Sequence, residues 1–186
     1  LAFMEMEGIE VDSKFLKSLS LKFEKKIKNL EKKIFKISKK EFNIASPKQL
    51  GEIIYNDLKI AGLKKTKKGS FATSASVLED LAFKGNEFPK LILDWRQVSK
   101  LKNTYSDSLP EHINPSTKRV HTSFLLAATT TGRLASSDPN LQNIPIKSED
   151  GKDIRKAFAA KKDHLLISAD YNQIEMRILA DLADVK

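Results

Sequence analysis

Residues 13–38 read SKFLKSLSLKFEKKIKNLEKKIFKIS, and this stretch decides the fold of the first half of the chain. Its apolar residues recur at steps of three and four, so they share one narrow helix face and leave the lysines on the other. They are Phe15, Leu19, Phe23, Ile27, Leu30, Ile34 and Ile37. So narrow a stripe is typical of a helix packed against one antiparallel neighbour. The pattern therefore predicts a long helix from Ser13 to Ser38, paired with a second helix.

The second helix of this pair is predicted over residues 89–109. Pro89 suits a first helical position, and Pro110 ends the helix. One side of this stretch is again apolar and carries Leu91, Trp95, Val98, Leu101 and Tyr105. These residues are expected to pack against the apolar stripe of residues 13–38.

Two short helices are predicted between the members of the pair. Ser46 is a capping residue, Pro47 fits the first helical position and Gln49 the capping-box position, so a helix should run to about Leu58. Thr73 or Ser74 caps the other helix. The connection between them is rich in lysine, at Lys64, Lys65, Lys67 and Lys68. A lysine run is usually solvated surface, but at the tip of projecting helices it favours contact with a DNA backbone.

Composition limits the classes of protein that this chain can belong to. It has 186 residues, is 40% hydrophobic and contains no cysteine, which excludes disulfides and thiolate metal sites. No apolar run reaches membrane-spanning length, and no signal peptide is visible. Of its 33 Lys and Arg residues, 22 lie in residues 1–110 beside 14 of the 24 acidic residues. This basic half suggests contact with phosphates, although a solvated lysine-rich surface is the alternative.

The pattern changes after Pro110, which predicts a boundary near residues 110–115. Residues 120–129 are rich in β-branched and aromatic residues and should be extended, and 136–145 read as a loop. Residues 154–160 fit either a short strand or a helical turn. Residues 164–170 predict a buried strand, and 173–183 a helix. The fold class is therefore α+β, with a helical subdomain over 1–112 and a mixed one over 113–186.

Two polar motifs in the second half point to chemistry. Residues 131–145 read TGRLASSDPNLQNIP, a loop of amides, hydroxyls and one arginine, which are groups that contact nucleic acid. Residues 165–177 read LLISADYNQIEMR, in which the predicted strand delivers Asp170 to the rim of a sheet, where a metal-assisted reaction can use it. An aspartate after a strand often simply caps the next helix. From the residues alone, both roles of Asp170 remain open.

These motifs resemble the family A DNA polymerases, the bacterial DNA polymerase I type. The family motif DYSQIELR opens the palm active site, and this chain has DYNQIEMR at residues 170–177. The resemblance implies a DNA-directed DNA polymerase that transfers a nucleotide from a dNTP to a primer 3′-hydroxyl. It also implies that Asp170 is catalytic and holds two Mg2+ ions with help from the Tyr171 backbone carbonyl. Gln173 would lie close to the nucleotide, and Glu175 would leave no room for a 2′-hydroxyl.

The resemblance also implies a set of DNA contacts. Arg133 would reach into the minor groove at the primer end. Residues 93–105, LDWRQVSKLKNTY, resemble a helix of the family's thumb, on which Arg96 and Lys100 would contact DNA. Further contacts would come from Asn140, Gln142, Asn143 and Lys147. The chain is thus similar to a helical thumb over 1–112, followed by the opening strands and active-site helix of a palm over 113–186.

The expected partners are primer–template DNA and dNTP, with no membrane, for a monomer in the bacterial cytoplasm that reaches the nucleoid through DNA. The family's fingers helix and its second metal-binding aspartate do not occur in the sequence, so we expect a fragment that is inactive alone. Two alternatives are a non-catalytic basic DNA-binding module and a single-subunit RNA polymerase. Glu175 and the TGRL block at residues 131–134 argue against the RNA polymerase, which must admit the 2′-hydroxyl.

Overall fold

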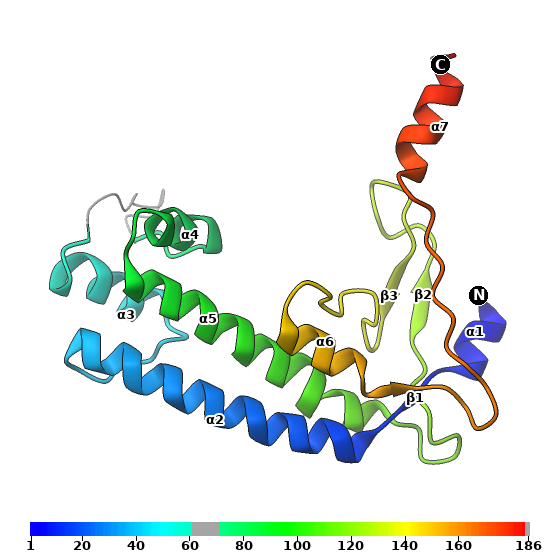
Figure 1. The fold of residues 1–186 in the computed structure, drawn as a ribbon, viewed down its shortest axis with the longest axis horizontal. Helices are drawn as coiled ribbons and strands as arrows, with labels where there is room; N and C mark the ends of the chain where they lie inside the picture. The colour runs from blue at the N-terminus through cyan, green and yellow to red at the C-terminus, as the bar shows by residue number, and fades with distance from the viewer. Residues whose placement is uncertain (61–70, 185–186) are drawn as a thin grey trace.

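A pair of long helices forms the centre of the protein (Figure 1). The computed structural model describes residues 1–60 and 71–184. Helix α2 spans Ser13–Ser38 and packs against α5, which spans Glu87–Leu101 and runs in the opposite direction. The chain continues from α5 into a π-helix, η2 (Lys102–Asp107), and a 3-10 helix, η3 (Leu109–His112). The predicted helix over residues 13–38 and its pairing are confirmed.

Helix α2 is stabilised at its start by a capping residue and along its length by a buried apolar stripe, and a left-handed residue ends it. The Asp12 carboxylate accepts a hydrogen bond from the Phe15 backbone N–H at 2.9 Å, which satisfies a group left unpaired in the first turn. The stripe buries Phe23 and Ile34 completely, and each such side chain contributes about 1.5–3 kcal/mol on leaving water. Lys39, with φ of 55°, ends the helix in a left-handed conformation.

The second member of the pair departs from its prediction at both ends. Helix α5 begins at Glu87, so Pro89 occupies the third helical position rather than the first. Proline is tolerated there because backbone N–H groups in the first turn have no partner within the helix. At the other end, the stretch predicted as one helix to residue 109 becomes η2, on which Tyr105 is buried.

Short helices close the far end of the pair. They are α3 (Pro47–Glu52), the π-helix η1 (Ile53–Asp57) and α4 (Ala75–Phe83). Ser46 caps α3 as predicted, accepting from the Gln49 N–H at 3.4 Å. The Gln49 side chain instead accepts from the Asn43 N–H at 2.7 Å, so the reciprocal half of the capping box is not formed. Ser74 precedes α4 without a side-chain capping bond. The predicted basic tip with Lys64, Lys65, Lys67 and Lys68 lies outside the described residues.

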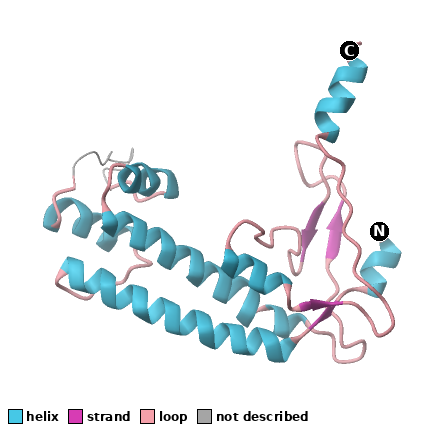
Figure 2. Ribbon diagram, in the orientation of Figure 1, coloured by secondary structure: helices cyan, strands magenta, loops and turns pink. Residues whose placement is uncertain are grey.

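Two small antiparallel sheets make up the rest of the fold (Figure 2). Strand β1 (Glu10–Val11) follows the short helix α1 (Ala2–Glu7) and pairs with β4 (Phe158–Ala159). Strand β2 (Ser123–Leu125) pairs with β3 (Ala135–Ser137), with Ser123 opposite Ser137. Extended structure within residues 120–129 therefore comprises the three residues of β2 and isolated β-bridges at Val120, and β3 includes the start of the predicted loop. Residues 154–160 contain both the end of helix α6 (Glu149–Arg155) and β4.

Contacts across the proposed boundary near residues 110–115 join the two parts of the chain. Lys22 and Lys26 of α2 form ion pairs with Asp153 and Asp150 of α6, at 2.6 and 2.5 Å. Val11, Val120, Ile154 and Ala157 belong to the same apolar core as the helix pair. The boundary we propose is thus a change of architecture along the chain, and the core continues across it.

The segment after β4 differs from its prediction. Residues 164–170 form no strand, and Leu165 and Ile167 are 88% and 89% exposed, so the predicted buried strand is wrong for this structure. A strand needs a neighbour for its backbone hydrogen bonds, and no described segment lies beside this one as a strand. The helix predicted after it is confirmed as α7 (Ile174–Leu182), which projects from the body of the protein and has no buried residue.

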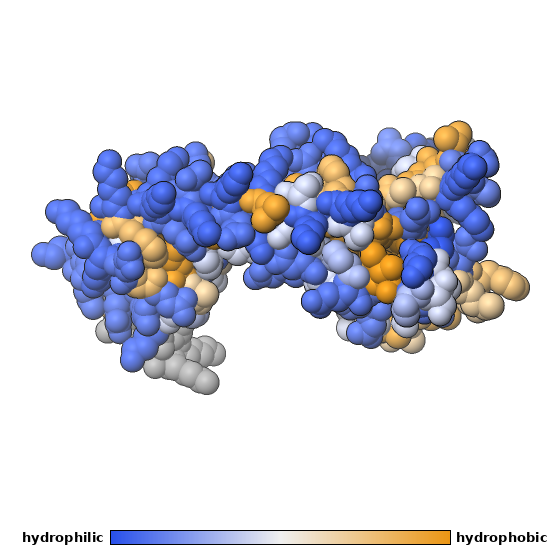
Figure 3. Space-filling model, turned by 90° about the horizontal axis from the view of Figure 1, so that it is seen from below, coloured by the Kyte–Doolittle hydropathy of each residue, from blue (hydrophilic) through white to orange (hydrophobic). Residues whose placement is uncertain are grey.

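The surface beneath the helix pair is mainly hydrophilic, with apolar side chains gathered in small patches (Figure 3). The lysines of α2 contribute to the hydrophilic character of this helix, whose apolar stripe faces the core. Among the helices described, none has the length and apolar character that crossing a membrane requires.

Candidate nucleic-acid interface

Two predicted site residues from different motifs contact each other. Arg133 lies on the loop between β2 and β3, and Glu175 lies in the first turn of α7. The Arg133 Nη2 donates to Glu175 Oε1 at 2.5 Å, with side chains that are 74% and 69% exposed. The Thr129 hydroxyl donates to the Arg133 carbonyl at 2.7 Å and closes the loop beneath it. The hairpin loop thus brings an arginine to the start of α7 (Figure 1).

Asp170 lies on the exposed segment before α7 and does not cap this helix. The N-cap position belongs to Gln173, in a left-handed conformation with φ of 55° and without a side-chain capping bond. The competing structural role of Asp170, helix capping, is therefore not the one that the structure shows. Tyr171 beside it is 80% exposed. Both residues are exposed and lie within five residues of Glu175 in the sequence.

The described residues do not form a complete magnesium site. Carboxylate and backbone carbonyl oxygens, such as those of Asp170 and Tyr171, are ligands that Mg2+ prefers. However, within residues 1–60 and 71–184 no group of three or more His, Cys, Asp or Glu residues is arranged to hold a metal ion.

Three of the four predicted DNA-contact residues after β3 lie along one groove. Gln142, Asn143 and Lys147 line a cavity of about 420 Å³ together with Gln97 of α5. Asn140 is partly committed to the loop, because its side-chain oxygen accepts from the Gln142 N–H at 3.0 Å and from the Ser136 hydroxyl at 3.3 Å. Its amide nitrogen is the group left for a ligand. Gln97 was not predicted, although its place one turn before Lys100 is a signal that it shares that residue's face.

Two side chains that sequence reasoning did not assign to the site hold this loop against the helices. The buried Tyr105 phenol donates to the Asn143 carbonyl at 2.5 Å, and burial raises the pKa of Tyr105. Arg155 of α6 donates to the carbonyls of Ile144 and Pro145 at 3.1 and 3.3 Å. Gly151 allows the close approach, since a Cβ there would lie 2.7 Å from the Pro145 Cβ. The loop is therefore anchored from both parts of the chain.

Arg96 and Lys100, predicted as equivalent DNA contacts, have different surroundings. Arg96 Nη1 donates to the Thr73 carbonyl at 2.6 Å, and burial lowers the pKa of its guanidinium. It lines a cavity of about 550 Å³ with Ser99, whose buried hydroxyl oxygen has no hydrogen-bond partner among the described residues. Lys100 is exposed. Arg96 therefore joins α5 to the start of α4, whereas Lys100 is available to solvent.

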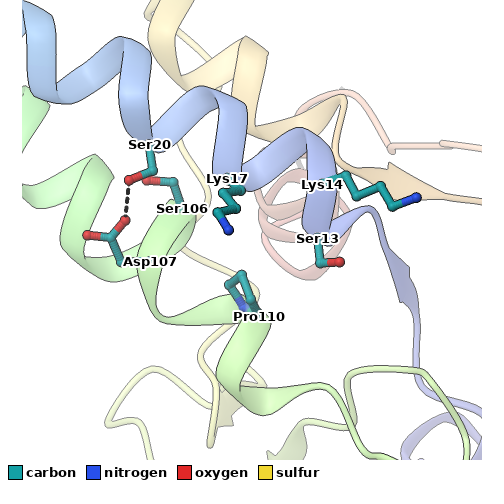
Figure 4. A pocket seen from close by; sticks show the side chains of 7 residues that line it. All are labelled: Ser13, Lys14, Lys17, Ser20, Ser106, Asp107 and Pro110. Atoms are coloured by element: carbon teal, nitrogen blue, oxygen red, sulfur yellow. Dashed lines mark hydrogen bonds between the residues drawn. The ribbon is translucent and has the colours of Figure 1, made fainter.

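Another cavity lies where the start of α2 meets the end of η2 (Figure 4). It has a volume of about 420 Å³, and Lys17 and Pro110 face one another across it. The Ser20 hydroxyl donates to Asp107 at 2.6 Å, and Lys102 pairs with the same carboxylate. Burial opposes ionisation of Asp107, but these hydrogen bonds outweigh it and lower its pKa. No predicted site residue lines this cavity.

Comparison with known proteins identifies the family. A model of DNA polymerase family A matches residues 13–186. The chain belongs to DNA polymerase family A. It is 54% identical to DNA polymerase I of Rhizobium leguminosarum over 185 residues, covering all of this chain and 18% of that protein. It is 49% identical to DNA polymerase I of Pseudomonas aeruginosa, covering 98% of this chain and 20% of that protein.

A solved family A structure has the same fold as this chain. It is the POL domain of Pol1 from M. smegmatis in complex with DNA primer-template and dNTP, with 38% sequence identity and a TM-score of 0.86. The match covers 98% of this chain and 32% of that one. The chain spans about a fifth of the length of the curated relatives it matches. The predicted family and the α+β fold class are confirmed, and the roles of individual residues stay predictions.

Proposed function

We propose that this chain forms the part of a DNA-directed DNA polymerase that grips the primer–template and tests the incoming nucleotide. The reaction joins a dNTP to the primer 3′-hydroxyl and releases pyrophosphate. The observation that carries the proposal is the contact between Arg133 and Glu175, in a chain that belongs to family A. During the reaction the primer end and the incoming nucleotide lie side by side. An arginine that contacts the minor groove at the primer end and a glutamate that faces the nucleotide must therefore be neighbours.

The chemistry of the exposed groups supports these roles. Arg133 uses Nη2 for Glu175, and a guanidinium has further N–H donors that suit acceptors in the minor groove. Such acceptors occupy similar places in every correct base pair, so a donor there responds to pair shape rather than to sequence. The groove with Gln142, Asn143 and Lys147 provides amides and a cation for sugar and phosphate oxygens. Lys100 is an exposed cation on α5 that suits a phosphate.

For Asp170 we propose the role of one carboxylate ligand in a site that binds two Mg2+ ions, with the Tyr171 carbonyl beside it. Bound ions of this kind stabilise negative charge on a transferring phosphoryl group. The described residues hold no group of three or more His, Cys, Asp or Glu that could bind a metal ion, so the remaining ligands would come from elsewhere in the complete polymerase. Gln173 is proposed to lie near the nucleotide, and Glu175 to exclude a 2′-hydroxyl.

For the chain on its own we propose DNA binding without catalysis, because the described residues contain no complete metal site. A single-subunit RNA polymerase is disfavoured by a glutamate at position 175. The relatives are bacterial, and we propose that the protein acts as a monomer on DNA in the bacterial cytoplasm.

Primer extension tests these functions against each other. The complete polymerase that contains this chain is supplied with primer–template, Mg2+ and either dNTP or rNTP, in parallel with the 186-residue chain. We expect extension with dNTP by the complete protein, weak extension with rNTP, and binding without extension by the chain alone. Equal use of rNTP would support the RNA polymerase, and binding without any extension by the complete protein would support the DNA-binding module.

A further inference from the structure

The Arg133–Glu175 pair is the connection between α7 and the β2–β3 hairpin. Helix α7 has no buried residue, so apolar packing does not fix its place. Within residues 1–60 and 71–184, its other side-chain hydrogen bond, from Arg177 to the Asn172 carbonyl, stays at its own base. An exposed ion pair contributes little to stability because water and salt screen it. Its value here is geometric, since it sets the position of two side chains relative to each other.

The geometry of the pair leaves the arginine able to bind a second acceptor. Only Nη2 donates to Glu175, and Nε and Nη1 have no acceptor among the described residues. The guanidinium is planar, so one hydrogen bond to a carboxylate restricts the direction of its remaining N–H groups. A carboxylate held by an arginine likewise loses part of its own freedom. Each side chain therefore orients the other.

We infer that Arg133 and Glu175 act as one unit, in which Glu175 positions Arg133 and Arg133 in turn contributes to the choice of sugar. This inference rests on the proposed function. When the remaining N–H groups of Arg133 bind a primer-end acceptor, the carboxylate of Glu175 is held toward the nucleotide. A mispaired primer end displaces the arginine, and the restraint on Glu175 is lost. Recognition of the primer end and selection of the sugar are thereby coupled.

A double-mutant cycle in the complete polymerase tests the coupling. The variants are Glu175→Ala, Arg133→Ala and the double variant, and the measurement is the ratio of kcat/KM for dNTP to that for rNTP. We expect each single change to lower this ratio by about tenfold or more, and the double variant to match Glu175→Ala alone. A ratio unchanged by Arg133→Ala, or effects of the two single changes that multiply, would overturn the inference.

A second measurement separates positioning from a general structural role. Glu175→Ala should weaken discrimination against a mismatched primer end even with the correct dNTP, because Arg133 loses its orientation. Arg133→Lys keeps the charge without the planar fork and should restore little of the coupling. A general loss of structure would lower all rates together and leave both ratios unchanged, which would contradict the inference.

The control is an ion pair of similar exposure far from the site. Lys28 and Glu24 on α2 pair at 2.7 Å, and the same cycle with Lys28→Ala and Glu24→Ala should leave both ratios unchanged. If the wild-type protein extends no primer, the proposed function fails and the inference fails with it. If the wild-type protein extends primers but the two effects multiply, only the coupling is refuted.

Discussion

The helix pair and the segment after β4 contain similar apolar residues with opposite fates. Phe23, Ile34 and Ile92 of the pair are fully buried, whereas Leu165 and Ile167 are almost fully exposed. Each helix of the pair covers the apolar stripe of the other, so this chain supplies both surfaces of that interface. Among the described residues, no element packs against residues 164–182 to bury their apolar side chains. A hydrophobic pattern thus predicts an element, but burial depends on what that element meets.

Exposed apolar side chains of this density mark a contact surface. Helix α7 adds Met176, Leu179 and Leu182, which are 62%, 58% and 80% exposed. We propose that this surface is covered in the complete polymerase. We expect the helix pair to contribute stability and the exposed segment to contribute chemistry.

The largest effect is expected at Asp170 in the complete polymerase. Asp170→Asn keeps the shape of the side chain but removes the charge that divalent ions require, so turnover should fall by orders of magnitude. DNA affinity should stay close to wild type. Asp181→Asn on the exposed face of α7 is the matched control and should retain activity. Near-normal primer extension by Asp170→Asn would refute the role proposed for this carboxylate.

The next largest effect is a difference between the helix pair and α7 in the free energy of unfolding that a substitution costs. Phe23→Ala should lower the free energy of unfolding of this chain by about 3–5 kcal/mol, because it leaves a cavity in the helix pair. Leu179→Ala on α7 should change it by less than about 0.5 kcal/mol. Urea denaturation followed by circular dichroism measures both. Equal losses would mean that α7 is packed in solution, contrary to its exposure here.

A smaller effect is expected where the helix pair holds the groove. Tyr105→Phe keeps the ring but removes the hydrogen bond to the Asn143 carbonyl, which should cost about 0.5–1.5 kcal/mol in urea denaturation. Tyr55→Phe is the control, since this ring is 40% exposed and stacks on Phe71. If both variants lose the same stability, the hydrogen bond to the loop is not the cause.

DNA binding by the chain should distinguish Lys100 from Arg96. Each neutralised phosphate contributes a slope of about −0.9 in log affinity against log salt. Lys100→Ala should make the slope shallower by about that amount in fluorescence anisotropy with primer–template DNA. Arg96→Ala should change the slope less and the stability more, because its guanidinium is bonded to the Thr73 carbonyl. Equal changes in slope for the two variants would contradict this distinction.

The smallest expected effect is on the stability of the fold at acidic pH. Hydrogen bonds from Lys156 and Lys22 lower the pKa of Asp153 from its ordinary value of 3.8. A carboxyl whose pKa is lower in the folded state stabilises the fold above its unfolded pKa, and this stabilisation is lost as the pH falls through the folded value. Stability should therefore decline below about pH 4. Asp153→Asn should show a weaker decline, and Lys22→Ala an intermediate one. An identical decline in all three proteins would exclude this ion-pair network as a cause.

The sequence predicted best those features whose causes are local. The stripe of α2 and the cap at Ser46 act within a few residues, and the bounds of α2 and α7 agree with expectation to within one residue. Family resemblance then named the residues of the candidate site. Without the resemblance, the role of Asp170 could not be assigned, because a helix cap and a metal ligand are both expected where a strand leads into a helix.

The features that were missed depend on residues far apart in the chain. Tyr105 bonds to a loop 38 residues later, and Arg133 meets Glu175 across 42 residues. No periodicity reports such contacts, because they arise only when separate elements pack. The predicted strand at 164–170 failed for the same reason, since a strand is completed by a neighbour that the pattern of its own residues cannot specify.

The pairing of β1 with β4 has a consequence for the order in which the chain folds during synthesis. Ala159, the partner of Glu10, is synthesised only after most of this chain has been made. At about 5–20 residues per second, this interval is on the order of ten seconds. Helices such as α2 form in about a microsecond, so the helix pair assembles before β4 is available to pair with β1. The pairing of β1 with β4 is therefore a late event, and its timing is limited by the rate of synthesis rather than by the rate of folding.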